Sequence, residues 1–149
     1  MFQSILVVCI GNICRSPVGE RLLDSHLPGR NITSAGLGAL AGRPADPLAT
    51  KVAGENGVSL RGHRARQFTS DIAHEADLVL AMESGHRRDI IRRAPQLDGR
   101  VMLFDHWIGA QGIPDPFRRE RDFHEAVFRR IDAAAKAWAD RLTTGNAAP

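Results

Sequence analysis

Two cysteines and an arginine lie close together near the start of the chain, in the segment CIGNICRS that covers residues 9–16. Cys9 follows an apolar run, and five residues, among them Gly11 and Asn12, separate it from Arg15. A loop of this composition can turn several backbone N–H groups toward one point, because glycine permits close approach and asparagine tolerates a left-handed backbone. The planar fork of arginine can bind two oxygens of a phosphate group. The segment therefore predicts a site for a tetrahedral oxyanion, with Cys9 at its base.

The same segment predicts a covalent mechanism. The positive end of a following helix and the nearby Arg15 stabilise the charged form of a thiol, so we expect Cys9 to be a thiolate at neutral pH. The segment lacks the Gly-Lys-Ser/Thr ending of a nucleotide-binding loop. A thiolate beside an oxyanion site indicates phosphoryl transfer through an enzyme-bound intermediate. The residues expected to surround the phosphate are Ile10, Gly11, Asn12, Ile13, Cys14, Arg15 and Ser16.

Phosphoryl transfer also needs an acid that protonates the leaving oxygen. Asp115 lies in the segment IPDPF, between the last apolar run and the C-terminal helical pattern. Pro114 and Pro116 restrict the backbone on both sides of this carboxyl group. We predict that Asp115 is the general acid, and Asp105, in the segment FDHW, is the second candidate.

Four short apolar runs alternate with helical patterns along the chain. The runs predict strands over residues 5–9, 32–35, 77–82 and 100–104, and the patterns predict helices over residues 17–27, 46–56, 84–93 and 121–142. The strands are nearly continuous in Val, Leu and Ile, which is typical of a parallel sheet that is covered on both faces. We therefore expect one α/β domain over residues 1–149, with three α/β/α layers, a central four-stranded parallel sheet and a frayed tail over residues 143–149. The loop after the first strand would then lie at the carboxyl edge of the sheet, where such folds bind ligands.

Composition narrows the possible partners. The chain has 149 residues and a net charge of +3, and its basic residues are interleaved with 17 acidic ones rather than gathered in a stripe. This distribution argues against a nucleic-acid partner. The first apolar run is too short for a signal peptide or a membrane span, so we expect a cytoplasmic protein with no membrane insertion. Two cysteines without metal-ligand spacing predict a reducing compartment, no metal site and no cofactor.

The segment CIGNICRS near the N-terminus and DPF in the last third of the chain together resemble the low-molecular-weight protein tyrosine phosphatases, and the resemblance covers nearly the whole chain. The stretches SAGLGALAGRPADP, HRARQ and VMLFDHW are similar to a bacterial branch associated with exopolysaccharide tyrosine kinases. The resemblance implies that Cys9 forms a cysteinyl-phosphate intermediate. It also implies that Asp115 protonates the tyrosine oxygen and then activates water. The implied substrate is a phosphotyrosine protein, expected to be a bacterial tyrosine autokinase.

The resemblance further implies roles for residues that spacing alone would not select. Ser16 matches a hydroxyl that donates a hydrogen bond to the thiolate. Asn12, Ser34 and His63 match a hydrogen-bond network that fixes the loop, together with Ser16.

The resemblance also suggests which residues contact the substrate and which respond to oxidation. The resemblance places Phe117 where many relatives carry tyrosine, and Leu40 where eukaryotic members usually carry an aromatic residue. We expect both side chains to flank the substrate ring. The family commonly pairs its two loop cysteines under oxidation, which implies a reversible disulfide between Cys9 and Cys14.

Other functions remain open at this point. An arginine-phosphate phosphatase would share the loop, although that branch tends to have threonine where this chain has Ile13. A phosphotyrosine-binding module without turnover would be expected to lose Cys9 or Asp115, and both are present. An arsenate reductase would need further cysteines after Cys14, and a thiol oxidoreductase would not need the arginine or the acid.

Overall fold

The apolar runs form the strands of one parallel sheet in the computed structural model, which describes residues 2–144. The strands are β1 (Ser4–Cys9), β2 (Asn31–Gly36), β3 (Leu78–Ala81) and β4 (Val101–Leu103). Their order across the sheet is β2-β1-β3-β4, and every neighbouring pair is parallel. Each strand begins and ends within one residue of its predicted bounds.

Strand β1 explains why its sequence shows no alternation of polar and apolar residues. Ile5, Val7 and Cys9 belong to the apolar core on one face of the sheet, whereas Leu6 and Val8 belong to the core on the other face. All five residues are buried, as expected for a central strand of a sheet that is covered twice.

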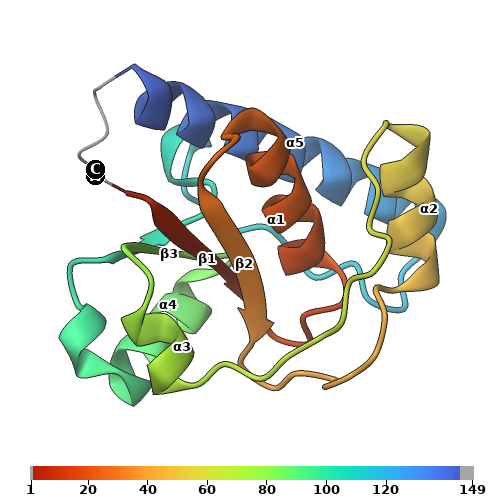
Figure 1. Ribbon diagram of the computed structural model, residues 1–149. Coiled ribbons are helices and arrows are strands. Elements are labelled where there is room, and N and C mark those ends of the chain that lie inside the picture. Colours follow the sequence, from red (N-terminus) through yellow and green to blue (C-terminus); the bar gives the residue numbers. More distant parts are fainter. Residues whose placement is uncertain (1, 145–149) are drawn as a thin grey trace.

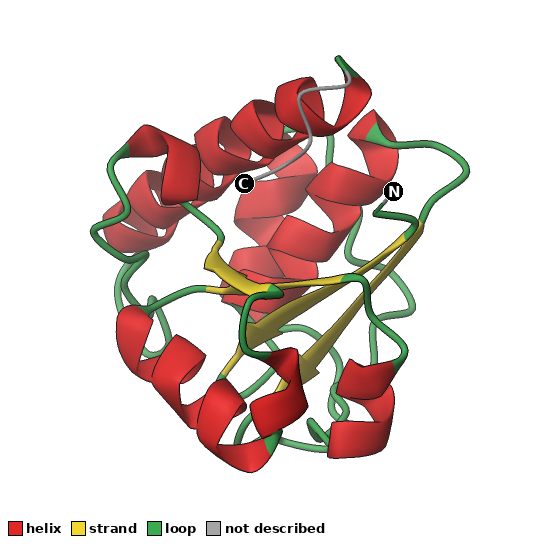
Figure 2. Cartoon of the chain, turned by 90° about the vertical axis from the view of Figure 1, so that its left-hand side faces the viewer, coloured by secondary structure: helices red, strands yellow, loops and turns green. Residues whose placement is uncertain are grey.

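Helices cover both faces of the sheet, as Figures 1 and 2 show. The first layer contains α1 (Arg15–His26), α2 (Pro47–Glu55) and α5 (Arg121–Thr143), and the second contains α3 (Ser70–His74) and α4 (Ser84–Arg93). Two 3₁₀ turns, η1 (Pro95–Leu97) and η2 (His106–Ile108), flank β4. The predicted class, a three-layer α/β/α domain with a four-stranded parallel sheet, is confirmed.

The helix predicted over residues 84–93 has the same bounds as α4. Asp46 caps α2: its side chain accepts hydrogen bonds from the backbone N–H groups of Leu48 and Ala49 at 3.1 and 3.0 Å. Helix α1, however, begins at Arg15 rather than at the predicted Pro17. Proline is tolerated throughout the first turn, because N–H groups there have no partner within the helix, so it does not mark the first residue.

Helix α3 was not predicted, because five residues are too few to show helical periodicity. At the other end, α5 extends through Thr143, one residue into the predicted frayed tail. The remainder of that prediction, from residue 145 onward, lies outside the described residues. Within residues 2–144, no helix has both the length and the apolar character required to cross a membrane.

The order of the strands places the loop after β1 where the two halves of the sheet diverge. The chain leaves β1, pairs β2 on one side of it and later returns to pair β3 on the other side. Loops from the two halves of a doubly wound sheet diverge at such a point and leave a crevice outside the carboxyl ends of the strands. The loop that follows Cys9 lies there.

Candidate active site

The loop over residues 10–14 joins β1 to α1 and owes its shape to Asn12. Asn12 has a φ of 59°, which is in the left-handed region that asparagine tolerates. Its side-chain amide donates to the hydroxyls of Ser16 at 2.7 Å and Ser34 at 3.0 Å, and its Oδ1 accepts from the Arg66 backbone N–H at 2.9 Å. These bonds fix the loop from beneath.

His63 contacts the backbone of Asn12. Its Nε2 lies 2.6 Å from the Asn12 carbonyl oxygen, and the ring is buried. Ser34 in turn donates to Glu20 at 2.6 Å. The structure thus brings together Asn12, Ser16, Ser34 and His63, although the first and the last are 51 positions apart in the sequence.

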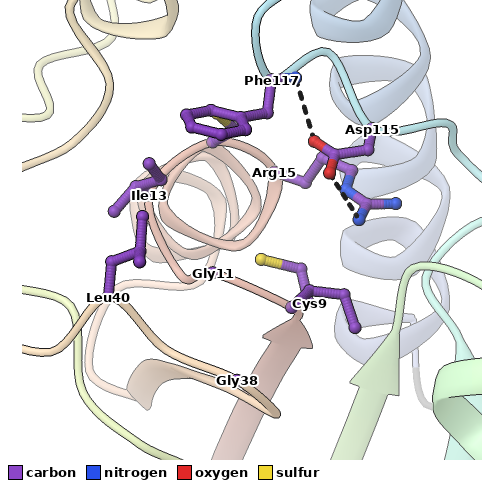
Figure 3. Close-up of a pocket in the computed structure, with 10 residues that line it drawn as sticks. Cys9, Gly11, Ile13, Arg15, Gly38, Leu40, Asp115 and Phe117 are labelled. Atoms are coloured by element: carbon purple, nitrogen blue, oxygen red, sulfur yellow. Dashed lines mark hydrogen bonds and ion pairs between the residues drawn. The ribbon is translucent and has the colours of Figure 1, made fainter.

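Cys9 lies at the base of a cavity of about 180 Å³ and is 2% exposed. Its Sγ is 2.9 Å from the Ser16 hydroxyl. Asn12 and Ser16, which were predicted to surround the phosphate, are buried behind the loop and are not among the residues that line this cavity. The lining residues are Cys9, Ile10, Gly11, Ile13, Cys14, Arg15, Gly38, Leu40, Asp115 and Phe117 (Figure 3).

Arg15 is 2% exposed, and its guanidinium is held from behind. Nη1 donates to the Ile113 carbonyl at 2.7 Å and also pairs with the carboxylate of Glu83. Nη2 lies 3.8 Å from Asp115 Oδ2, and Nε is buried without a partner among the described residues. Nε and Nη2 are therefore the donors that remain for a ligand.

Asp115 lies on the same side of the cavity as Arg15 (Figure 3). Its Oδ1 accepts from the Phe117 backbone N–H at 3.0 Å, and its side chain is 48% exposed. A carboxyl group in this position is restrained yet accessible to a leaving group and to water.

Asp105, the second candidate for the acid, lies elsewhere. It is fully buried, and its Oδ2 accepts from the Gly112 backbone N–H at 2.9 Å and from Arg130 at 3.2 Å. Asp105 does not line the cavity, and its contacts secure the loop that leads to Asp115.

Apolar side chains form the opposite side of the cavity. Ile13 and Leu40 lie together across from Arg15, with the ring of Phe117 above them (Figure 3). Phe117 is 37% exposed, and the Arg118 guanidinium lies 5.2 Å from its ring centroid. This wall suits a flat apolar group on the phosphate ester.

Cys14 occupies the N-cap position of α1 and is buried. Burial, followed by the charges of Asp46 and Asp115, raises the pKa of the Cys14 thiol well above its usual range. Cys14 is therefore a neutral thiol at physiological pH. The disulfide between Cys9 and Cys14 remains a prediction, and both are reduced here.

Sequence reasoning missed three residues that shape this site. Glu83 and the Ile113 carbonyl hold Arg15, and Gly36 lies where the Cβ of any other residue would collide with the Ile10 carbonyl. Glu83 follows β3 at the carboxyl edge of the sheet, and this placement was the only signal for it. No group of three or more His, Cys, Asp or Glu side chains that could hold a metal occurs between residues 2 and 144.

A family model described as low molecular weight phosphotyrosine protein phosphatase matches residues 4–147. The chain belongs to this family. It is 51% identical over 143 residues to the "Probable low molecular weight protein-tyrosine-phosphatase AmsI" of Erwinia amylovora, which covers 96% of this chain and 99% of the relative. The family and the enzyme class predicted from the sequence, a protein-tyrosine phosphatase, are confirmed.

Solved structures of the family have the same fold. The tyrosine phosphatase Wzb from Escherichia coli K30, in complex with sulphate, matches with a TM-score of 0.94 at 49% identity, over 95% of this chain and 99% of that one. The YwlE arginine phosphatase from Geobacillus stearothermophilus matches with a TM-score of 0.91 at 32% identity, over 98% and 96% of the two chains. Both specificities therefore occur on this scaffold.

Proposed function

We propose that this family member hydrolyses phosphotyrosine in proteins and that Cys9, Arg15 and Asp115 carry the reaction. The proposal rests on one observation, the convergence of a thiol, a guanidinium and a carboxyl group in a single cavity from segments that are distant in the chain.

In the first step, Cys9 Sγ attacks phosphorus and the bond to the tyrosine oxygen breaks. Nε and Nη2 of Arg15, with the N–H groups of the loop, stabilise the negative charge on the three equatorial oxygens. Asp115 gives its proton to the leaving oxygen, which departs as neutral tyrosine. The product is a cysteinyl phosphate.

In the second step, Asp115, now a carboxylate, accepts a proton from water while the water oxygen attacks phosphorus. The bond to Sγ breaks, and the hydroxyl of Ser16, 2.9 Å from the sulfur, stabilises the departing thiolate. Phosphate leaves and the enzyme returns to its starting state.

The cavity wall supports an aryl ester as substrate. Leu40, Ile13 and Phe117 offer apolar surface to a ring. An arginine phosphate would instead bring a polar guanidinium group against this wall. The named tyrosine phosphatases are also more similar in sequence than the arginine phosphatase, at about half of the positions against 32%.

We extend the proposal to a partner. The stretches that resemble the branch associated with exopolysaccharide tyrosine kinases support a tyrosine autokinase of exopolysaccharide synthesis as the physiological substrate, and hence action in the cytoplasm.

Parallel assays on one peptide sequence, carrying either phosphotyrosine or phosphoarginine, test the function. Release of phosphate from the phosphotyrosine peptide, with much slower release from the phosphoarginine peptide, is the expected result. Faster release from phosphoarginine would assign the chain to the other specificity. Tight binding of phosphotyrosine without release of phosphate would indicate a binding module.

A further inference from the structure

The guanidinium of Arg15 is fixed by acceptors that lie outside the cavity. Nη1 contacts the Glu83 carboxylate and the Ile113 carbonyl, which leaves Nε and Nη2 for the phosphate. Because the five donors of arginine lie in one rigid plane, fixing Nη1 also fixes the directions of the other donors. The orientation of the Arg15 donors toward the phosphate therefore depends on Glu83.

Glu83 lies at the N-cap position of α4 but does not cap the helix with its side chain. It is the N-cap residue of α4 with an extended backbone, φ −141° and ψ 155°, yet its side chain makes no capping hydrogen bond. Serine, threonine, aspartate and asparagine are the residues that cap helices well. The carboxylate of Glu83 is instead turned toward Arg15.

His86 lies behind this carboxylate in the first turn of α4. Its Nε2 is 3.6 Å from Glu83 Oε2, the oxygen that also contacts Arg15. The residue is 7% exposed, and its Nδ1 is buried with no partner in the described part of the chain. Two side chains that can be cationic therefore face one carboxylate oxygen.

The charges around His86 come from three elements. Arg15 faces it from α1, Asp115 from the loop before α5, and Glu83 and Asp89 from the start and middle of α4. Burial, followed by the charge of Arg15, lowers the pKa of His86 below its usual value, and the three acids oppose this shift. His86 is therefore neutral at pH 7 and takes up a proton only in acid.

We propose that Glu83 is a positioning residue for Arg15 and that His86 regulates it through protonation. While His86 is neutral, Glu83 holds Arg15 in the orientation that binds an oxyanion. When His86 is protonated, the imidazolium shares the same carboxylate oxygen, the hold on Arg15 weakens, and oxyanion binding weakens with it. The inference rests on the proposed function, because it takes Arg15 as the phosphate-binding group.

Calorimetric titration with inorganic sulfate tests the role of Glu83. Sulfate is a suitable probe because it keeps its double negative charge between pH 5 and 8 and needs no turnover. We expect Glu83→Gln to bind sulfate about tenfold more weakly than the wild type at pH 7.5, since a neutral amide replaces a charged acceptor. Asp89→Asn is the matched control: it removes the same charge from the same helix, but Asp89 pairs with Arg92 and Arg93.

Several outcomes would overturn the role of Glu83. Sulfate binding that stays the same or becomes tighter in Glu83→Gln would mean that its charge merely competes with the ligand for Arg15. Equal weakening in Asp89→Asn would indicate a general field effect. Thermal unfolding of each variant shows whether weaker sulfate binding reflects a less stable fold. Because the side chain of Glu83 is 44% exposed, we expect its replacement to change the stability only slightly.

The pH dependence tests His86. Between pH 7.5 and pH 5, we expect the wild type to lose more sulfate affinity than His86→Asn, which cannot take up a proton. Glu83→Gln should show the same flatter profile, because His86 acts through Glu83. Parallel profiles of wild type and His86→Asn, or a steeper loss in the variant, would overturn the regulation.

These results separate the inference from the function on which it rests. A wild type that binds sulfate, with Glu83→Gln unchanged, overturns only the inference. A wild type that binds no sulfate at any pH overturns the role of Arg15 and the inference together.

Discussion

At the scale of single residues, the site separates binding from bond making. In the proposed mechanism the loop and Arg15 bind the oxyanion, whereas Cys9 contributes one sulfur atom at the base of the cavity, 2.9 Å from the Ser16 hydroxyl. Binding and turnover should therefore respond to different substitutions.

Cys9→Ser should reduce hydrolysis of an aryl phosphate by on the order of 10³-fold or more, because a serine hydroxyl is a far weaker nucleophile than a thiolate. Vanadate or phosphate should still bind with nearly the wild-type affinity, since Arg15 and the loop remain. Steady-state kinetics and calorimetry on the same preparation measure the two effects. Loss of both would assign Cys9 a part in forming the loop itself.

Asp115→Asn should slow release of a poor leaving group by about 10²-fold, since asparagine cannot supply a proton, and should affect an activated leaving group much less. A series of aryl phosphates of graded leaving-group pKa measures this difference. Asp105→Asn is the control: its buried contacts predict a loss of about 1–3 kcal/mol in stability with an unchanged dependence on the leaving group. A selective loss in Asp105→Asn instead would show that the acid had been assigned to the wrong residue.

Peroxide should oxidise Cys9 to a sulfenic acid, and attack by Cys14 should then form a disulfide and release water. Burial keeps Cys14 protonated, so this second step requires it to lose its proton. Wild type treated with peroxide and then a thiol reductant should regain most activity, whereas Cys14→Ser should stay inactive with over-oxidised Cys9. Activity assays with peptide mass spectrometry measure this; equal recovery without a linked peptide would make Cys14 a packing residue.

At the scale of elements, the active-site loop rests on the end of β2. Gly36, the last residue of that strand, lies against the loop so closely that an added Cβ would collide with the Ile10 carbonyl and lie 3.1 Å from the Asn12 backbone nitrogen. The neighbouring backbone groups cannot move away without changing the loop. The strand end therefore acts as a template for the loop.

Gly36→Ala should consequently lower both phosphate affinity and turnover, because the loop must shift. Gly54→Ala is the matched control: Gly54 lies in α2, its added Cβ meets nothing within 4 Å, and alanine should stabilise the helix by about 0.5–1 kcal/mol. Urea unfolding and vanadate inhibition of both variants measure the contrast. Full activity in Gly36→Ala would show that the loop adapts without cost.

At the scale of the whole molecule, the site lies where the two halves of the sheet diverge, and buried titratable groups surround it. His124 in α5 is 4% exposed and lies beside Pro116, the residue that follows Asp115, in the lining of a small cavity. Burial lowers the pKa of His124 below its usual value, against the charges of Asp46 and Asp115. The folded protein thus holds this histidine neutral.

Stability should for that reason fall in mild acid. Below about pH 6.5 the unfolded chain protonates His124 while the folded chain does not, so the unfolded state binds more protons and the free energy of unfolding decreases as pH falls. Above that pH the contribution is fully present. Urea unfolding at pH 7.5 and 5.5 should show a smaller difference for His124→Gln than for the wild type. His74→Gln, at an exposed position, is the control, and an equal change in both variants would contradict the assignment.

Local patterns in the sequence were sufficient for the strands, the longer helices and the loop from Cys9 to Arg15. Each of these depends on neighbours within a few residues, so apolar runs, proline, glycine and cap residues predicted them. The short α3 escaped prediction because it spans too few residues to show a period.

The family and the residues expected to perform the chemistry could be predicted from the sequence, because the Cys-x5-Arg loop and the Asp-Pro segment are short and local. The sheet could be predicted because each strand is a continuous apolar run. The choice between Asp115 and Asp105 and the contacts that orient Arg15 came from the folded structure, which places Asp115 in the cavity. Glu83 and Ile113 contact Arg15 from 68 and 98 residues away along the chain. Such contacts arise when separate strands end at the same edge of the sheet. The residues close to Arg15 in the sequence contain no pattern that predicts them.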